Sequence, residues 1–223
     1  MDKQDFFNGM SQAACTVSVV TTDGAHGKTG VTVSAMASVS ADPPSLLVCV
    51  HHLSKACEVL QKNGVMCVNV LRDDQAFVSD TFAGRLPAPN NDHFAVAEWD
   101  TAATGAPLLR GAMVNFDCEI VKYFQSGSHV IFIGEVRDMR HQPHGQALVY
   151  ANRAYGRATS LDDFVKTPEL DANKPLLKIA CYTTLGAFFM PRLIAQYRNQ
   201  YPEAQLKLAE GVQQELYQGI ESG

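Results

Sequence analysis

The sequence has no apolar run that approaches the roughly 20 residues needed to span a membrane. It begins MDKQDFFNGM, without a basic region followed by an apolar one, so we expect no secretory signal and a cytoplasmic location. Basic residues are not in excess, because 18 Lys and Arg stand against 23 Asp and Glu and the net charge is −5. Binding to a phosphate backbone requires a basic face. Neither a membrane nor a nucleic acid is therefore expected as a partner.

The sequence also lacks several motifs of chemical sites. Its six cysteines include no C-x-x-C pair, and most stand among apolar residues, as in VMCVNV. This is typical of buried free thiols in a reducing compartment, and a zinc site is the less favoured alternative. No G-x-G-x-x-G follows a strand, which argues against a Rossmann fold. No convincing nucleophile or carboxylate pair is present, so we predict no catalytic side chain and no metal site.

What is present favours a β-rich protein. Apolar residues make up 46% of the 223 residues, enough for one packed domain and an appendage. Residues 31–40 alternate between apolar and polar side chains, which predicts a single strand. Further strands are expected at 15–22, 45–50, 65–71, about 112–124, about 129–139 and 147–156, with helices over 2–13, 54–63 and 74–83 and a long loop over 84–106. Many strands and few short helices predict a closed or nearly closed sheet.

The composition changes after Gly156. Residues 158–174 are polar and acidic, which indicates a linker. The remaining segment reads as a strand, an amphipathic helix interrupted by Pro191, a second strand and a second helix. We therefore expect a first domain over 1–157, a linker over 158–174 and a β-α-β-α fragment over 175–223.

The polar face of the 31–40 strand is the first candidate binding surface. Thr32, Ser34, Ser38 and Ser40 lie on this face. A solvated outer face is the ordinary explanation. The functional one is that hydroxyls and backbone amides meet the ribityl chain and ring edges of a flavin.

Other polar residues stand where a ligand would use them. Ser54 and Lys55 begin a helix, whose free N–H groups and dipole favour a phosphate, although an ordinary cap is the alternative. Asn69 lies in an apolar run and needs a partner if it is buried, either a ligand or another strand. His129 and Tyr155 would contact a nicotinamide or serve a structural role.

Several segments, taken in order, resemble the FMN-binding split-barrel family of flavin reductases, which are the reductase components of two-component flavin monooxygenases. The run GVTVSAMASVSADPP is the most specific of them. The others are FFNGMSQAACTVSVVTT, SLLVCV, GVMCVNVL with DDQ, DTFAG, TGAPLLRGAMVNFDCEI, SHVIFIGEV and LVYANRAYG. Together they cover about residues 6–157. The resemblance implies a mainly β fold, a split β-barrel with short helices.

The resemblance also implies a set of cofactor contacts. The flavin contacts would be Thr32, Val33, Ser34, Ser38, Val39, Ser40, Ser54, Lys55, Asn69, Phe82 and Ala83, with Lys55 at the phosphate. His129 would bind the nicotinamide, and Tyr155 joins it as a candidate stacking ring from the reading of the residues alone. The sequence departs from the family pattern at Ser128, which replaces an Asp, and at His51-His52-Leu53, which replaces a more polar stretch.

The activity implied is an NAD(P)H-dependent flavin reductase, in which hydride passes from nicotinamide C4 to flavin N5. The flavin would be FMN, with FAD possible, and the donor NADH or NADPH. Reduced flavin would leave for a separate oxygenase, and the protein would be a homodimer. The alternatives are a flavin oxidase on a related split barrel and a flavin- or effector-binding sensor without turnover.

Residues 176–223 resemble a different family, the opening of the effector-binding domain of LysR-type regulators. No helix-turn-helix region accompanies this segment, so DNA binding is not implied. The resemblance places weak effector contacts at Thr183 and Thr184, through which a small effector would tune the reductase.

Overall fold

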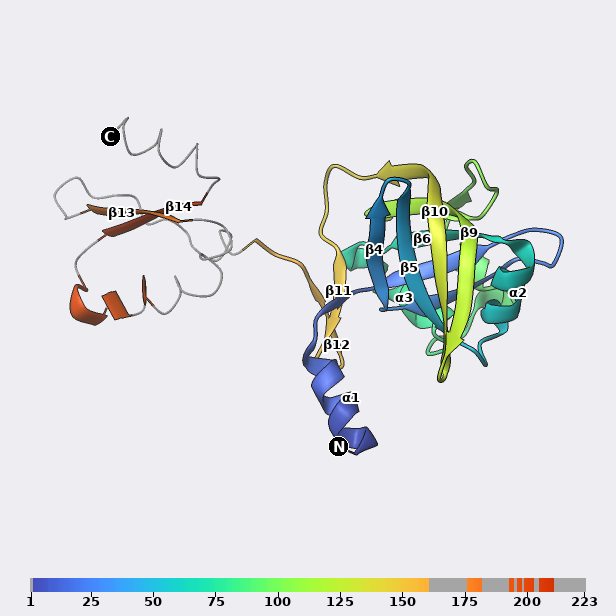
Figure 1. The fold of residues 1–223 in the computed structure, drawn as a ribbon, viewed down its shortest axis with the longest axis horizontal. Coiled ribbons are helices and arrows are strands. Elements are labelled where there is room, and N and C mark those ends of the chain that lie inside the picture. The colour runs from blue at the N-terminus through green and yellow to red at the C-terminus, as the bar shows by residue number, and fades with distance from the viewer. Residues whose placement is uncertain are drawn as a thin grey trace. The chain divides into compact units, whose positions relative to one another are not determined.

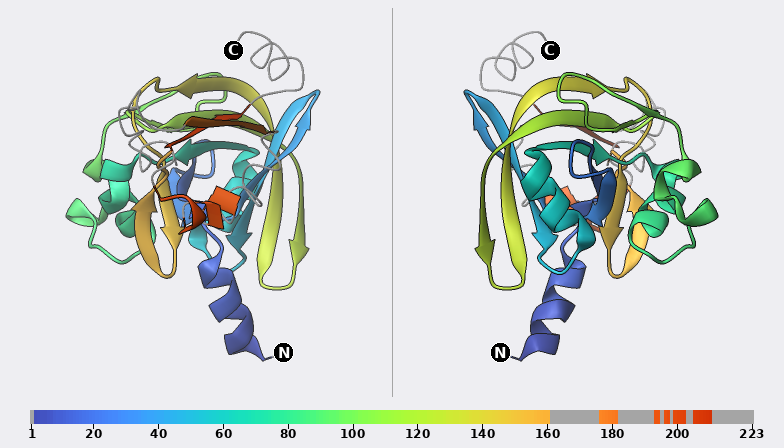
Figure 2. Two further views of the ribbon diagram at one scale, coloured as in Figure 1. Left: turned by 90° about the vertical axis from the view of Figure 1, so that its left-hand side faces the viewer. Right: turned by 90° about the vertical axis from the view of Figure 1, so that its right-hand side faces the viewer.

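The computed structural model describes residues 2–160, 176–181, 193–194, 196–197, 199–202 and 205–210. The chain divides into two compact units, Met1–Thr159 and Ser160–Gly223. Each unit is described separately. The first is built around an antiparallel sheet that curves on itself (Figure 1; Figure 2).

The central sheet of the first unit has seven strands. Their order is β3 (Thr29–Val33), β2 (Ser18–Thr22), β6 (Val65–Val70), β9 (Val114–Ser126), β10 (His129–His141), β5 (Pro44–His51) and β4 (Met36–Ala41). The two ends of this order come together, because β3 also contacts β5 and the Cys49 amide donates to the Ala35 carbonyl at 3.1 Å. The sheet is a nearly closed barrel, and the prediction of a mainly β split barrel is confirmed.

The prediction of one strand over 31–40 is wrong. The extended run is interrupted at Ser34 and Ala35, which belong to no strand. β3 and β4 are therefore separate strands, and they lie at opposite ends of the strand order. Alternation predicts extended backbone but carries no information about which strands become neighbours. The expected strand over 15–22 is likewise divided, into β1 (Cys15–Thr16) and β2.

Three α-helices and three single-turn helices accompany the barrel. Helix α1 is Lys3–Gln12, α2 is Lys55–Asn63 and α3 is Ala76–Phe82. The helix α2 begins as predicted, where the Ser54 hydroxyl accepts from the Ala56 amide at 3.3 Å. It ends at Gly64, whose φ of 71° is left-handed and favours glycine. The short 3-10 helices are η1 (Asp73–Gln75), η2 (Pro89–Asn91) and η3 (His93–Val96), the last two within the expected long loop.

Two further small sheets complete the first unit. The first joins β1, β11 (Leu148–Ala151) and β12 (Ala154–Arg157), and the second joins β7 (Trp99–Asp100) and β8 (Leu108–Leu109). The main core fills the barrel interior around Val48, Leu60, Met66 and Phe132. A second core packs α3 and the β11 strand against the outside of β2.

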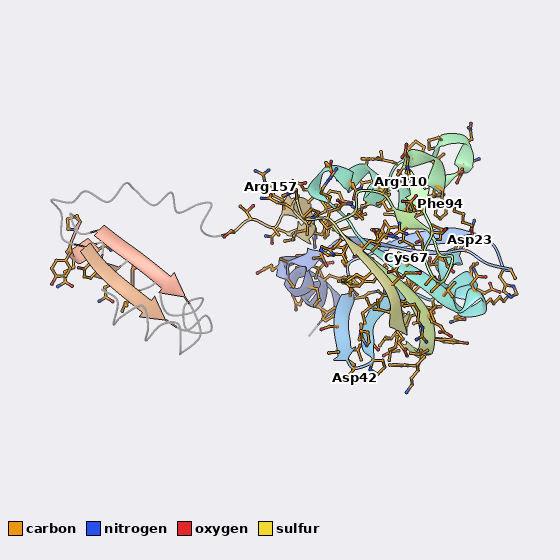
Figure 3. All side chains as sticks on the ribbon, turned by 90° about the horizontal axis from the view of Figure 1, so that it is seen from above. Asp23, Asp42, Cys67, Phe94, Arg110 and Arg157 are labelled. Atoms are coloured by element: carbon orange, nitrogen blue, oxygen red, sulfur yellow. The ribbon has the colours of Figure 1, made fainter. Side chains whose placement is uncertain are left out.

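The cysteines of the first unit are free thiols, as predicted. Cys57, Cys67 and Cys118 are buried, and Cys15 and Cys49 are half-buried. Figure 3 shows Cys67 among the crowded side chains of the barrel, whereas Asp23 and Asp42 lie at its edges. Within the described ranges, no group of His, Cys, Asp and Glu has the arrangement of a metal site. No described helix is long and apolar enough to cross a membrane.

The second unit contains a pair of parallel strands, β13 (Leu176–Cys181) and β14 (Gln205–Glu210). Parallel neighbours need a crossover connection, and described helical residues lie between them at 193–194, 196–197 and 199–200. The two strands agree with the predicted fragment. Thr183, Thr184, most of the expected linker and the second helix lie outside the described residues.

Candidate functional site

An open pocket of about 170 Å³ lies where β3 ends. It is lined by Val17, Thr32, Val33, Ser34, Ser79, Ala83, Arg85, Tyr150 and Tyr155. Five residues that the sequence analysis singled out meet here: Thr32, Val33, Ser34, Ala83 and Tyr155. They come from β3 and the residue after it, the residue after α3, and β12, three segments that are distant in the sequence.

Close packing of α3 on β3 forms one wall of the pocket. The Thr32 hydroxyl donates to the Ser79 carbonyl at 2.7 Å. A Cβ atom on Gly30 would lie 2.7 Å from the Phe82 ring, so only glycine allows this approach. The opposite wall is the β11–β12 hairpin, where Tyr150 and Tyr155 are register partners with ring centres 5.5 Å apart.

A polar network lies along the tyrosine wall. The Tyr155 hydroxyl donates to Asp80 Oδ1 at 2.6 Å and lies 3.0 Å from Ser79 Oγ. Burial and the hydrogen bond to Asp80 raise the pKa of Tyr155, so the phenol remains protonated and remains a donor. Arg85 Nη1 is 3.4 Å from both Asp80 Oδ1 and the Tyr155 hydroxyl. The Arg85 side chain is 54% exposed, which leaves donors for an anion.

Sequence reasoning missed four residues of this pocket, Val17, Ser79, Arg85 and Tyr150. One signal for Arg85 was available, because it directly follows the DTFAG segment and places a cation next to an expected flavin contact. No local pattern distinguishes Tyr150 from a core tyrosine. Its place in the pocket depends on pairing with Tyr155 across the hairpin.

The remaining residues of the 31–40 run lie elsewhere. Ser38 and Ser40 line a separate, apolar pocket of about 240 Å³, and Val39 is 48% exposed. The other lining residues of that pocket are Met36, Ala37, Pro44, Ser45, Leu46, Phe116 and Val136. The expected continuous polar face is therefore divided between two pockets, because β3 and β4 occupy opposite ends of the strand order.

The first residues of α2 offer a second cation. Lys55 is exposed and forms no ion pair with any residue that the structure describes. Ser54 uses its hydroxyl as the helix cap. Neither residue lines the pocket at β3, and their contact with a phosphate stays a prediction.

Asn69 and Phe82 are buried and line neither pocket. The Asn69 amide oxygen accepts from the Leu109 amide and from Asn115 Nδ2, each at 2.8 Å, and its nitrogen donates to the Val19 carbonyl at 2.9 Å. Phe82 contacts Trp99 and neighbouring rings in the second core. Of the two partners that the sequence left open for Asn69, neighbouring strands are the ones seen here.

His129 is exposed at the start of β10 and does not line the pocket at β3. Its Nδ1 atom lies 3.0 Å from Ser128 Oγ, and its ring centre lies 5.1 Å from that of His51. The role of His129 with a nicotinamide stays a prediction.

The groups that meet at the pocket suit binding rather than acid–base catalysis. It presents hydroxyls, two aromatic rings, a protonated phenol and a guanidinium. A planar ligand with hydrogen-bonding edges and an anionic group matches this set. Within the pocket lining there is no Ser, Cys or Lys next to a histidine base, so nothing there resembles an activated nucleophile.

Comparisons with known proteins agree with this description. Residues 10–159 match the family described as flavin reductase like domain, and residues 171–223 match the LysR substrate binding domain. The FMN reductase (NADH) RutF of Acinetobacter baylyi is 44% identical over 155 residues, which are 70% of this chain and 81% of that protein. The solved flavin reductase PheA2 is 31% identical with a TM-score of 0.65, covering 72% of this chain and 100% of that one. BorF, the flavin reductase component of a bacterial two-component tryptophan halogenase, is 32% identical with a TM-score of 0.64, covering 71% of this chain and 99% of that one.

Proposed function

The chain belongs to the flavin reductase like domain family, and on that premise we propose that it uses NADH to reduce FMN. The observation that carries the proposal is the pocket in which Ser34, Arg85 and Tyr155 converge at the end of β3. The relative from Acinetobacter baylyi, named as an FMN reductase (NADH), supports the choice of flavin and donor.

The residues of the pocket fit a flavin. Ser34 is exposed at the strand break, where its hydroxyl can meet the polar edge of a ring system. Tyr150 and Tyr155 supply aromatic surface, which favours offset or edge contacts with a planar ligand. Arg85 supplies a half-exposed guanidinium.

A bound flavin would supply the hydride-accepting chemistry, which leaves binding and orientation to the protein. Thr32 holds α3 against β3 and so fixes one wall of the pocket. Tyr155 keeps its proton and remains tied to Asp80. No side chain of the pocket needs to transfer a proton. The pocket would hold the flavin and nicotinamide rings about 3–3.5 Å apart and exclude water.

The test is NADH oxidation by the full chain with FMN, FAD or riboflavin, repeated with NADPH. We expect multiple turnovers with free FMN and the highest kcat/KM with NADH. No oxidation of either nicotinamide with any flavin overturns the proposal and favours a flavin-binding sensor. Tight flavin retention with oxygen-dependent turnover of an organic substrate favours the oxidase alternative.

We place the flavin phosphate at Ser54 and Lys55, and the structure offers Arg85 as the competing cation. Riboflavin separates the two because it has no phosphate. Lys55→Gln is expected to weaken FMN binding roughly tenfold and leave riboflavin binding unchanged, since a charge-assisted hydrogen bond is lost. Lys62→Gln, on the same helix and paired with Glu58, is the control. The same pattern in Arg85→Gln instead would assign the phosphate to Arg85.

A separate oxygenase is the proposed recipient of the reduced flavin. BorF is the reductase component of a two-component halogenase, and this supports a similar division of labour here. Because this use requires the flavin to leave, we expect reversible, non-covalent flavin binding.

A homodimer is also proposed, formed through the outward face of the barrel. Val48 and Phe132 point into the core, so alternate residues of their strands point outward. Register pairing joins these outward residues into one mostly apolar patch of Leu47, Cys49, Ile131, Ile133 and Phe124, with Lys122 on the same face as the register partner of Ile133. An exposed apolar patch of this kind is typical of a surface that binds another protein. Arg137 beside it is paired with Glu119 and Glu135, and this charge balance lets the surface face a copy of itself.

Control by a small effector is the proposed role of 175–223, with 158–174 as the linker. The match to the LysR substrate binding domain supports it. Thr183 and Thr184 remain its proposed contacts, and coupling requires that the effector bind two states of the protein with different affinity.

A further inference from the structure

Three histidine rings gather where β5 ends and β10 begins. His51 and His129 are register partners on these strands, with ring centres 5.1 Å apart in an edge-on arrangement. The rings of His51 and His52 stack with centres 5.0 Å apart. His52 also holds the turn before β10, because its backbone amide donates to the Ser128 carbonyl at 3.0 Å and its Nδ1 lies 2.8 Å from the same oxygen.

The hydrogen bonds indicate which ring nitrogen carries the hydrogen in His51 and in His52. A carbonyl oxygen only accepts, so His52 Nδ1 carries the hydrogen in its bond to Ser128. His51 Nδ1 accepts from the Leu53 amide at 3.2 Å, which places its hydrogen on Nε2 in the neutral ring. His129 Nδ1 is engaged by the Ser128 hydroxyl at 3.0 Å. Among the residues that the structure describes, the Nε2 atom of His129 has no hydrogen-bond partner, so it can meet a ligand.

The strand that carries His51 runs close to the end of β3, although none of the three histidines lines the pocket there. The Cys49–Ala35 hydrogen bond continues the β4–β5 ladder by one step, so the chain at Ser34 runs on toward Val50 and the end of β5. β3 and β5 are in contact at this corner of the barrel. Ser34 lines the pocket, and His51 is the last residue of β5.

We propose that His51 and His52 are positioning residues for the reduced nicotinamide dinucleotide, through their contacts with His129 and its turn. The proposal rests on the proposed function. The His52 side chain holds the turn that carries His129 by its hydrogen bond to the Ser128 carbonyl, beside a backbone bond that any residue at this position keeps. His51 limits the orientation of the His129 ring by its edge-on contact. The turn contains Gly127 with a φ of 56°, and all three histidines are exposed, so core packing does not fix them.

Positioning of this kind predicts a specific kinetic pattern. His52→Leu and His51→Leu each remove a contact of the turn or ring and leave the pocket at β3 unchanged. We expect the KM for NADH to rise roughly tenfold while kcat at saturating NADH and the FMN affinity stay within about twofold. His52→Asn keeps an amide donor close to the position of Nδ1 and is expected to restore most of the NADH affinity. His26→Leu, on the β2–β3 turn, is the control.

The experiment separates this inference from the proposed function. Binding of NAD⁺ measured by calorimetry needs no turnover, so an inactive wild type would overturn the function while His52→Leu still tests the positioning. An unchanged NADH KM and NAD⁺ affinity in both Leu variants overturns the inference. An equal loss of FMN affinity, or His52→Asn as impaired as His52→Leu, also overturns it. If a Leu variant unfolds, His52→Gln, which moves the amide one bond away, is compared with His52→Asn, and equal NADH KM values overturn it.

Discussion

Asn69 lies at the point where separate segments of the barrel meet the β6 strand. Its amide oxygen accepts from Leu109 on β8 and from Asn115 on β9, and its nitrogen donates to Val19 on β2. A buried amide with every group paired fixes the mutual position of these segments. The sequence predicted that Asn69 needs partners, but the partners are defined only by the folded barrel.

Replacement of Asn69 by Ala is expected to destabilise the protein by at least about 2 kcal/mol, because buried donors of Leu109 and Asn115 lose their acceptor. Urea unfolding measures this loss, with the exposed Asn8→Ala as a control expected within about 0.5 kcal/mol of wild type. The FMN affinity of the folded protein is expected to stay unchanged, since Asn69 lines neither pocket. A selective loss of FMN affinity would instead return Asn69 to the flavin site.

The Cys118 thiol is expected to make the free energy of unfolding decrease as the pH rises in the alkaline range. Burial raises the pKa of this thiol to about 12, with a smaller contribution from the charge of Asp117. The folded state therefore holds the proton more tightly than the unfolded chain, whose thiol titrates near its ordinary value of about 8.5. The contribution of this thiol to stability is complete below its ordinary pKa of about 8.5, and it is lost progressively as the pH rises toward 12.

The expected slope is a loss of about 1.4 kcal/mol in the free energy of unfolding per pH unit above pH 9 for this thiol. Cys118→Ala should flatten the pH dependence by that amount, and the half-buried Cys15→Ala is the control. Equal slopes for wild type and Cys118→Ala between pH 9 and 11 would contradict the assignment.

At the scale of elements, the contact between α3 and β3 decides the shape of the pocket. Phe82 covers Gly30, and its ring also packs against Trp99 in the second core, so it has little freedom to move. Ser79 and Ala83, at the same end of α3, line the pocket. Displacement of the helix would therefore change the pocket directly.

Gly30→Ala is expected to cost about 1–3 kcal/mol of stability, because the new Cβ would approach the Phe82 ring to 2.7 Å. FMN affinity should fall with it, as α3 moves away from β3. Fluorescence titration with FMN measures this effect. Gly9→Ala in α1 meets no atom within 4 Å and is expected to keep wild-type FMN affinity. Unchanged binding in Gly30→Ala would show that the α3 wall does not contribute to the flavin site.

At the scale of the whole molecule, the outward apolar patch predicts a dimer in solution. Phe124→Asp places a charge in that patch and is expected to convert the dimer into a monomer, because a buried unpaired charge is costly. Light scattering at micromolar concentration measures the mass. Phe77→Asp on α3 is the control, since Phe77 is 47% exposed and Phe124 is 45% exposed. A wild-type monomer with full activity would exclude the dimer proposal.

The division of the chain predicts that the first unit works alone. The Ala158 amide still donates to the Ala147 carbonyl at 3.1 Å, so a truncated chain should end at Thr159. We expect residues 1–159 to keep NADH oxidation and FMN affinity within about twofold, because every pocket residue lies in this unit. Any response of the full chain to small aromatic acids should be lost. An unfolded truncation would show that the second unit is part of the catalytic fold.

Local patterns in the sequence were sufficient for most elements. Period-two alternation marks extended backbone, and Ser54 and Gly64 mark the ends of α2, because these signals depend on neighbouring residues only. The family resemblance added the split barrel and most of the pocket at β3. The sequence alone was thus sufficient to name Thr32, Val33, Ser34, Ala83 and Tyr155 as candidate binding residues.

Tertiary structure decided the rest, since strand neighbours and side-chain partners are long-range properties. The break at Ser34 and Ala35 separates residues that the alternation placed on one face. Arg85 and Tyr150 reach the pocket only because α3 and the β11–β12 hairpin pack on either side of β3. His51 and His129 meet only through the register of β5 with β10, which the spacing of residues along the chain does not contain.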